Sequence, residues 1–216
     1  MADKPLEGLR VAILTATNFE QSEMTEPRKA LHDAGAETVL ISPQSGEVQG
    51  MKHDVQLDRF KVEATLADTK PDGFDGLLLP GGAMNADKLR AMPEAQHFVR
   101  HFQERHKPMA VICHAPWLLA SAGVARGRKL TSYHTIKDDM RHAGAEWVDE
   151  EVVVDDNLVT SRQPSDIPAF NREMIALLAR HRAHEHQRPL AKTVQEYVGA
   201  DEVPGAQEMG TRGQRE

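Results

Sequence analysis

The chain has 216 residues, a formal net charge of −7 and a single cysteine. This length fits one α/β domain with an appendage, or at most two small domains, and a core of this size needs neither a disulfide nor a metal. One cysteine excludes an intramolecular disulfide framework. The acidic balance argues against a general affinity for nucleic acid or acidic membranes, and the polar first residues and short apolar runs lead us to expect a cytoplasmic protein without a membrane span.

The first half of the chain predicts strands that alternate with helices. Short apolar runs predict buried strands over residues 10–14, 38–42 and 74–79. Helices are predicted from the loop after the first strand to Ala34, over 62–67 and over 94–105. Gly35 follows the first of these helices, and Pro27 is expected in its first turn. Residues 43–58 are rich in turn formers and predict a small excursion such as a hairpin.

The second half continues this alternation. Strands are predicted over 109–112 and 130–132, and helices over 115–120, 136–142 and 166–182. The segments 151–154 and 158–161 flank three turn-forming residues and predict a hairpin. The alternation implies a mostly parallel sheet with helices on both faces, and such sheets bind ligands at the carboxyl ends of their strands. Loops 15–23, 80–87 and 113–114 follow predicted strands, so we expect them to converge on one pocket.

Cys113 lies between a predicted buried strand and a predicted helix. A strand-to-helix turn of this kind is the nucleophile elbow, which lifts a side chain off the sheet edge. The helix N-terminus and the adjacent His114 both favour a thiolate, so we expect a reactive Cys113 with a strained backbone. The competing interpretation is a buried structural cysteine beside an unrelated histidine.

Two further features have a chemical and a plain interpretation. Glu20 and Glu23 are either surface acids at a helix start, or a protonated glutamate that donates a hydrogen bond to a thiolate. The glycines at 81–82 either end a strand, or allow the N–H of Gly82 to stabilise an oxyanion together with the N–H of His114.

Several separate motifs resemble the PfpI intracellular protease family, within the superfamily of Parkinsonism-associated deglycases and class I glutamine amidotransferase-like proteins. They are the acidic loop 18–23 and the segments 78–82, 110–116, 131–133, 136–140, 146–149 and 151–154. The resemblance covers about residues 8–182. It implies a flavodoxin-like three-layer sandwich over 8–182, and it leaves a C-terminal extension, 183–216, which is either flexible or draped on a neighbouring subunit.

The resemblance also implies roles for single residues. It implies a homodimer or a higher oligomer of dimers, in which the Cys–His pair takes an acid from a neighbouring subunit. The candidate acid is Asp87, which is one residue farther along than in the family pattern and is an aspartate where the family has a glutamate; its plain alternative is an N-cap for a helix beginning at Lys88. Glu23 corresponds to the glutamate beside the thiol, with Glu20 as the weaker candidate, and Tyr133 to a pocket residue near the cysteine.

The leading hypothesis is a cysteine-dependent hydrolase or deglycase that acts on glyoxal- or methylglyoxal-derived adducts or on small peptides, without a cofactor or a metal. The alternative is a redox-responsive stress protein or chaperone that signals through oxidation of Cys113. A glutamine amidotransferase is disfavoured, because the late histidine–acid segment at 184–186 lies beyond the last predicted helix. The histidines at 181, 184 and 186 are interpreted as a solvated helix end and not as a metal site.

Overall fold

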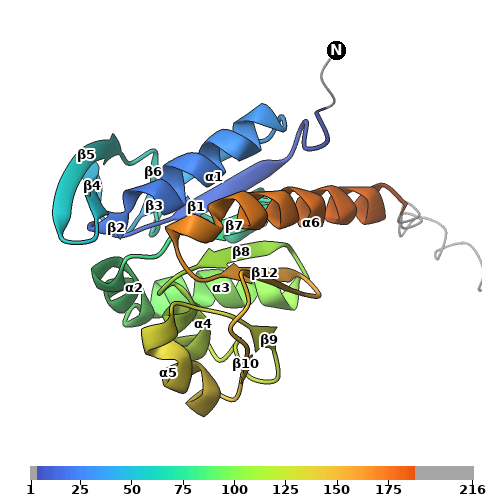
Figure 1. Ribbon diagram of the computed structural model, residues 1–216. Coiled ribbons are helices and arrows are strands. Elements are labelled where there is room, and N and C mark those ends of the chain that lie inside the picture. The colour runs from blue at the N-terminus through green and yellow to red at the C-terminus, as the bar shows by residue number, and fades with distance from the viewer. Residues whose placement is uncertain (1–3, 188–216) are drawn as a thin grey trace, which may run out of the picture. The chain divides into compact units, whose positions relative to one another are not determined.

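The computed structural model describes residues 4–187, and its central sheet lies between two layers of helices (Figure 1). The strand order is β11-β12-β8-β7-β1-β3-β6. Neighbouring strands are parallel except for the antiparallel pair β11–β12. The seven strands are β1 (Arg10–Leu14), β3 (Glu37–Ser42), β6 (Ala64–Thr65), β7 (Gly76–Leu79), β8 (Met109–Ile112), β11 (Val152–Asp155) and β12 (Leu158–Ser161). The predicted flavodoxin-like α/β sandwich is therefore confirmed.

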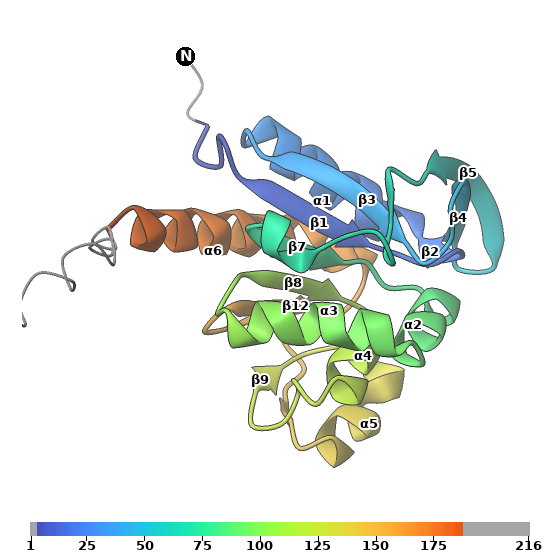
Figure 2. The ribbon, with the colours of Figure 1, turned by 180° about the vertical axis from the view of Figure 1, so that it is seen from behind.

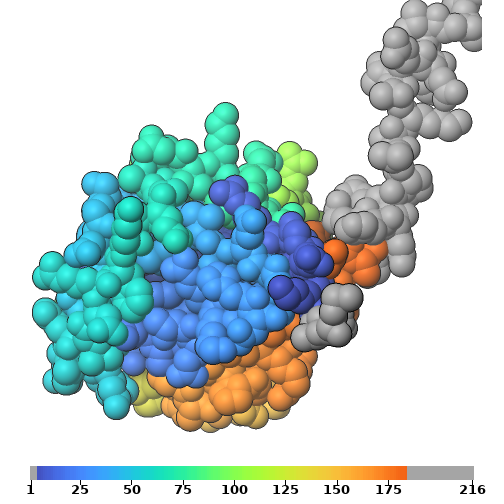
Figure 3. Space-filling model, turned by 90° about the horizontal axis from the view of Figure 1, so that it is seen from above, coloured from blue at the N-terminus to red at the C-terminus, as the bar shows by residue number. Residues whose placement is uncertain are grey.

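Successive side chains along each strand point to opposite faces of the sheet and pack into two separate cores. In β1, Ala12 and Leu14 point to one face, and Val11 and Ile13 point to the other. The first core is covered by α2 (Ala83–Arg90), α3 (Pro93–Glu104), α4 (Pro116–Ser121) and α5 (Lys137–His142), which Figure 2 shows below the sheet. The second core is covered by α1 (Gln21–Asp33) and α6 (Ile167–Gln187), coloured blue and orange in Figure 3.

Two small sheets accompany the central one. The predicted excursion is a hairpin of β4 (Glu47–Lys52) and β5 (Val55–Lys61), and β4 also pairs with the short β2 (Phe19–Glu20). The second small sheet pairs β9 (Lys129–Leu130) with β10 (Glu146–Trp147). Three short 3-10 turns complete the elements, at Pro71–Gly73, His134–Ile136 and Pro164–Asp166. No helix within residues 4–187 is long and apolar enough to cross a membrane.

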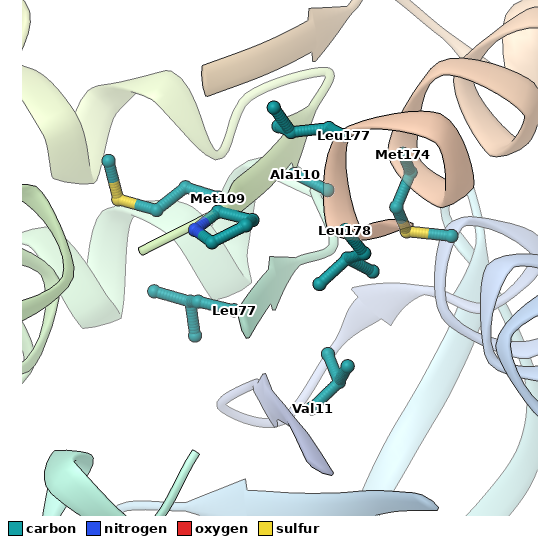
Figure 4. Close-up of a pocket in the computed structure, with 8 residues that line it drawn as sticks. Val11, Leu77, Met109, Ala110, Met174, Leu177 and Leu178 are labelled. Atoms are coloured by element: carbon teal, nitrogen blue, oxygen red, sulfur yellow. The ribbon is translucent and has the colours of Figure 1, made fainter. Parts of the chain in front are cut away.

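A small cavity of about 10 Å³ lies between α6 and the sheet, where Leu178 and Met174 approach β1, β7 and β8 (Figure 4). Gly76 makes room for this contact, because a Cβ there would lie 2.5 Å from Cδ2 of Leu178. The cavity is too small for a ligand and is a packing feature of the core.

Three local predictions are wrong. Pro27 lies in the second turn of α1, because the helix already begins at Gln21; the burial of Pro27 beside Met24 and Leu31 offsets the lost backbone bond. Residues 62–67 form no helix, because Ala64–Thr65 pairs with the end of β3. The last helix runs to Gln187 and not to Arg182. Residues 188–216 lie outside the described residues, so the division of the chain at residue 182 stays a prediction.

Candidate active site

Cys113 occupies the predicted turn between β8 and α4. Its φ is +65°, a left-handed conformation that is strained for a residue other than glycine. Two backbone bonds hold it there: its N–H donates to the carbonyl of Ser161 at 3.0 Å, and its carbonyl accepts from the N–H of Tyr133 at 2.8 Å. The predicted strand–turn–helix geometry and backbone strain are therefore present, with the side chain directed into the site.

His114 is placed to exchange a proton with the sulfur. Its Nδ1 lies 3.1 Å from Sγ of Cys113. The imidazole stacks on the ring of Tyr133, with centroids 4.7 Å apart, and lies 5.4 Å from the ring of Trp117. Burial, reinforced by His134, lowers the pKa of His114 below its ordinary value. The imidazole is therefore neutral at pH 7 and can accept a proton.

Glu23 lies on the other side of the sulfur, in the first turn of α1. It is completely buried, and its Oε2 accepts the N–H of Gly81 at 2.9 Å. Burial raises the pKa of Glu23 from 4.5 to about 8, against the smaller lowering effects of hydrogen bonds to Gly81 and Cys113. The carboxyl is therefore mostly protonated at pH 7 and can donate a hydrogen bond. Its Oε1 is buried and has no hydrogen-bond partner among the residues described.

The expected thiolate at Cys113 is not what the structure favours. Burial raises the pKa of the Cys113 thiol well above its ordinary value. The backbone N–H groups of Gly82 and His114 lower it, but their effect is smaller than that of burial. The following helix has only six residues, so its dipole offers little compensation. In the free protein the sulfur is therefore a thiol whose proton must move before attack.

The turn at 80–82 requires both of its glycines. A Cβ at Gly81 would lie 2.6 Å from the Cβ of Cys113, and one at Gly82 would lie 2.7 Å from the backbone nitrogen of Glu20. Gly82 also has a φ of +84°, which glycine adopts without strain. The absence of both side chains lets the backbone approach the sulfur, as an oxyanion-binding role requires.

Six of the seven predicted site residues line one pocket of about 170 Å³. They are Glu20, Glu23, Gly82, Cys113, His114 and Tyr133. The sequence did not single out the other three lining residues, which are His53, Ala83 and Pro164. His53 belongs to the turn of the β4–β5 hairpin, and its N–H donates to Oε2 of Glu20 at 2.9 Å. Because this contact depends on the pairing of β4 with β2, no local pattern could have revealed it.

Asp87 is the predicted site residue that does not line the pocket. It lies within α2 with a side chain that is 70% exposed, and its Oδ1 pairs with Nε of Arg90 at 3.3 Å. The N-cap alternative is wrong, because α2 begins at Ala83 and not at Lys88. Within one chain, Asp87 therefore lies outside the pocket that Cys113 and His114 line.

No group of three or more histidine, cysteine, aspartate or glutamate side chains that could hold a metal exists within the described part of the chain. The side chains of His184 and His186 lie outside the described residues, so the interpretation of the late histidines stays a prediction.

The model of the DJ-1/PfpI family matches residues 9–177. General stress protein 18 of Bacillus subtilis is 45% identical over 173 residues, which are 79% of this chain and 98% of the relative. Protein/nucleic acid deglycase 2 of Escherichia coli is 45% identical (78% and 97% covered), and Deglycase PfpI of Pyrococcus furiosus is 42% identical (79% and 99%). Among solved structures, Drosophila melanogaster DJ-1beta superposes with a TM-score of 0.72 at 29% identity, covering 79% of this chain and 90% of the other.

Proposed function

The chain belongs to the DJ-1/PfpI family, and from this premise we propose that it is a cysteine-dependent deglycase whose nucleophile is Cys113. Relatives named as deglycases support a deglycase-type function. One observation carries the proposal: Sγ of Cys113 lies 3.1 Å from Nδ1 of a neutral His114, in a pocket that also presents the N–H of Gly82. This arrangement couples a nucleophile, a base and an oxyanion donor.

The proposed substrates are adducts of glyoxal or methylglyoxal with amines or thiols, and a pocket of about 170 Å³ suits such small groups. As the Cys113 sulfur forms a bond to the aldehyde-derived carbon, His114 takes the thiol proton and gives it to the departing amine or thiol. The product is a hemithioacetal on the sulfur. A proton then moves from that carbon to the neighbouring carbonyl carbon, and the hydroxyl proton moves to the former carbonyl oxygen, which together give a thioester of a 2-hydroxy acid. Water then releases a 2-hydroxy acid and restores the thiol, so no external oxidant or reductant is needed.

The substitution Cys113→Ala tests this proposal. Release of free side-chain amine from methylglyoxal-treated Nα-acetyllysine should be measurable for the wild type and absent for the variant. A small peptide serves as a second substrate, since the same elbow could attack a peptide carbonyl. Turnover that survives Cys113→Ala would refute a cysteine nucleophile.

A redox-responsive stress protein is the second candidate, and one contact favours it. The protonated Glu23 faces the sulfur and could donate a hydrogen bond to an oxidised Cys113. If the wild type turns over neither adducts nor peptides, while peroxide adds oxygen to Cys113 before the methionines, this candidate replaces the deglycase.

We further propose that Asp87 acts on the His114 of a neighbouring subunit in a homodimer or a higher oligomer. Nε2 of His114 lies 3.4 Å from Oγ1 of Thr135, and within residues 4–187 no carboxylate forms an ion pair with it. The Asp87 carboxylate lies on the exposed face of α2, where an exchange of its Arg90 partner would let it reach across an interface and orient this ring.

Mixed oligomers distinguish the two placements of the acid. Cys113→Ala and Asp87→Asn subunits are each expected to be inactive alone. If Asp87 acts across the interface, mixing them pairs an intact Cys113 with an intact Asp87 at some sites, and part of the activity returns. Heterodimers that form and stay inactive would rule the shared site out.

A further inference from the structure

The turn at 80–82 directs two successive N–H groups into the active site. The N–H of Gly81 donates to Glu23, and the N–H of Gly82 faces the sulfur of Cys113. Two adjacent glycines have a wide choice of backbone dihedral angles, so they do not by themselves fix the direction of either N–H. Another part of the molecule must hold this turn in its active orientation.

One side chain holds the carbonyl oxygens of the same two peptide groups. Asn85, the third residue of α2, donates from Nδ2 to the carbonyl of Pro80 at 2.9 Å and to that of Gly81 at 2.8 Å. Its Oδ1 accepts the N–H of Ala16, in the loop after β1, at 2.6 Å. The side chain is completely buried, and both of its donor hydrogens are used.

The geometry of the peptide bond connects these contacts to the active site. The peptide bonds of residues 4–187 include no cis bond, and the C=O and N–H of a trans peptide point in opposite directions. Holding the Pro80 carbonyl therefore aims the N–H of Gly81, and holding the Gly81 carbonyl aims the N–H of Gly82. We propose that Asn85 is a positioning residue that directs these two N–H groups at the carboxyl of Glu23 and at the reacting sulfur.

This inference deepens the proposed function, on which its kinetic consequence rests. Asn85 is not among the residues that line the pocket of Cys113, so it acts through the backbone of the turn. A purely structural asparagine would stabilise the start of α2 and nothing more. The two roles differ in the titration of the Cys113 thiol, because only a positioning residue changes how firmly Gly82 faces the sulfur.

The test substitution is Asn85→Asp, which keeps the shape of the side chain but replaces the Nδ2 donor by an oxygen that faces two carbonyl oxygens. The matched control is Asn157→Asp. Asn157 is also buried, and its Nδ2 donates to the carbonyl of Lys107 at 2.9 Å, at the amino end of the strands and away from the sulfur. For each protein we would measure the rate of Cys113 alkylation by iodoacetamide against pH, the steady-state kinetics and the melting temperature.

For Asn85→Asp we expect the alkylation midpoint to rise by about one pH unit or more. We also expect kcat to fall at least about tenfold while KM changes less than about threefold, since loss of one oxyanion donor commonly costs a factor of 10² to 10³. The control should leave the alkylation midpoint and kcat unchanged. A folded Asn85→Asp protein with wild-type midpoint and kcat, or a control with the same losses, would overturn the inference.

Two provisions keep the test decisive. Asn85→Ser is measured in every case, because a new carboxylate at position 85 could raise the pKa of Cys113 by its charge alone. The serine hydroxyl is uncharged and too short to hold both carbonyls, so the same upward shift of the midpoint is expected and its absence counts against the inference. The alkylation profile needs no substrate. If the wild type shows no turnover at all, the proposed function fails, while the profile still decides the role of Asn85.

Discussion

Replacing Glu23 by glutamine should remove a pH-dependent loss of stability from the protein. Glu23 is completely buried, and its pKa moves from 4.5 to about 8 on folding. Since one pKa unit corresponds to about 1.36 kcal/mol, ionising this carboxyl costs up to about 5 kcal/mol more in the folded than in the unfolded protein. Glutamine keeps the shape, offers Oε1 to the N–H of Gly81 and carries no titrating proton.

The sign of the effect follows from proton counting. Between pH 4.5 and about 8 the folded protein keeps the Glu23 proton that the unfolded chain has already lost. The free energy of unfolding therefore decreases as the pH rises through this window, and the loss is complete above about pH 8. The free energy of unfolding of Glu23→Gln, relative to that of the wild type, should therefore increase by several kcal/mol as the pH rises from 5 to 8.5.

Urea denaturation at pH 5, 6, 7, 8 and 8.5 measures this difference, at one fixed protein concentration so that any self-association is held constant. The control is Glu26→Gln, which replaces an exposed glutamate on the same helix and should follow the wild-type curve. Curves for Glu23→Gln and the wild type that run parallel across the whole range would refute the assignment of a protonated Glu23.

Three further outcomes follow from the structure. Gly81→Ala should lower turnover at least tenfold and destabilise the protein by about 1–3 kcal/mol, since its Cβ would meet Cys113 and Glu23 at 2.6 Å. Gly73→Ala, where a Cβ meets only Nη1 of Arg10 at 3.7 Å, is the control for activity and stability in kinetics and urea denaturation. Leu178→Ala should cost about 2–5 kcal/mol in the same denaturation assay and leave turnover of the folded protein intact, because it enlarges a core cavity away from the pocket. Alkylation of Cys113 should be slow at pH 7 and should accelerate to above pH 9, because its thiol pKa is raised; a rate at pH 7 equal to that of an unfolded-peptide thiol would contradict this.

The sequence could predict those parts of the fold that depend on local patterns. Short apolar runs located β1, β7 and β8, and turn formers located both hairpins. The local pattern gives the wrong element where a distant pairing partner determines the structure. Residues 62–67 have a helix-like pattern, but Ala64–Thr65 pairs with the edge of β3 as a strand. It also misplaced Pro27, since the start of α1 is set by the pairing of β2 with β4.

For the site, the sequence could predict which loops meet but not the protonation states within them. The strand-to-helix position of Cys113 is visible in the order of residues, whereas the acid at Glu23 is implied only by the resemblance to the PfpI family. The thiolate was not a sound expectation, because the pKa of Cys113 is dominated by burial, which depends on packing from α1 and from the turn at 80–82. Asn85 escaped notice for the same reason: its partners are backbone groups that no side-chain pattern records.

These protonation states determine how the site can become reactive. At pH 7 in the free protein, Cys113 is a protonated thiol, Glu23 is mostly a protonated carboxyl, and the imidazole of His114 is neutral. A thiol that stays protonated until a carbon electrophile is in the pocket is protected from adventitious oxidation, since the thiolate is the reactive form. In the proposed reaction, transfer of the thiol proton over 3.1 Å to His114 would place a cation beside a nascent anion, and the two charges would stabilise each other where separate charges would be costly. The N–H of Gly82 already faces the sulfur. In the proposed reaction, bond formation to the electrophile therefore drives the proton transfer, and the turn at 80–82 stabilises the developing negative charge.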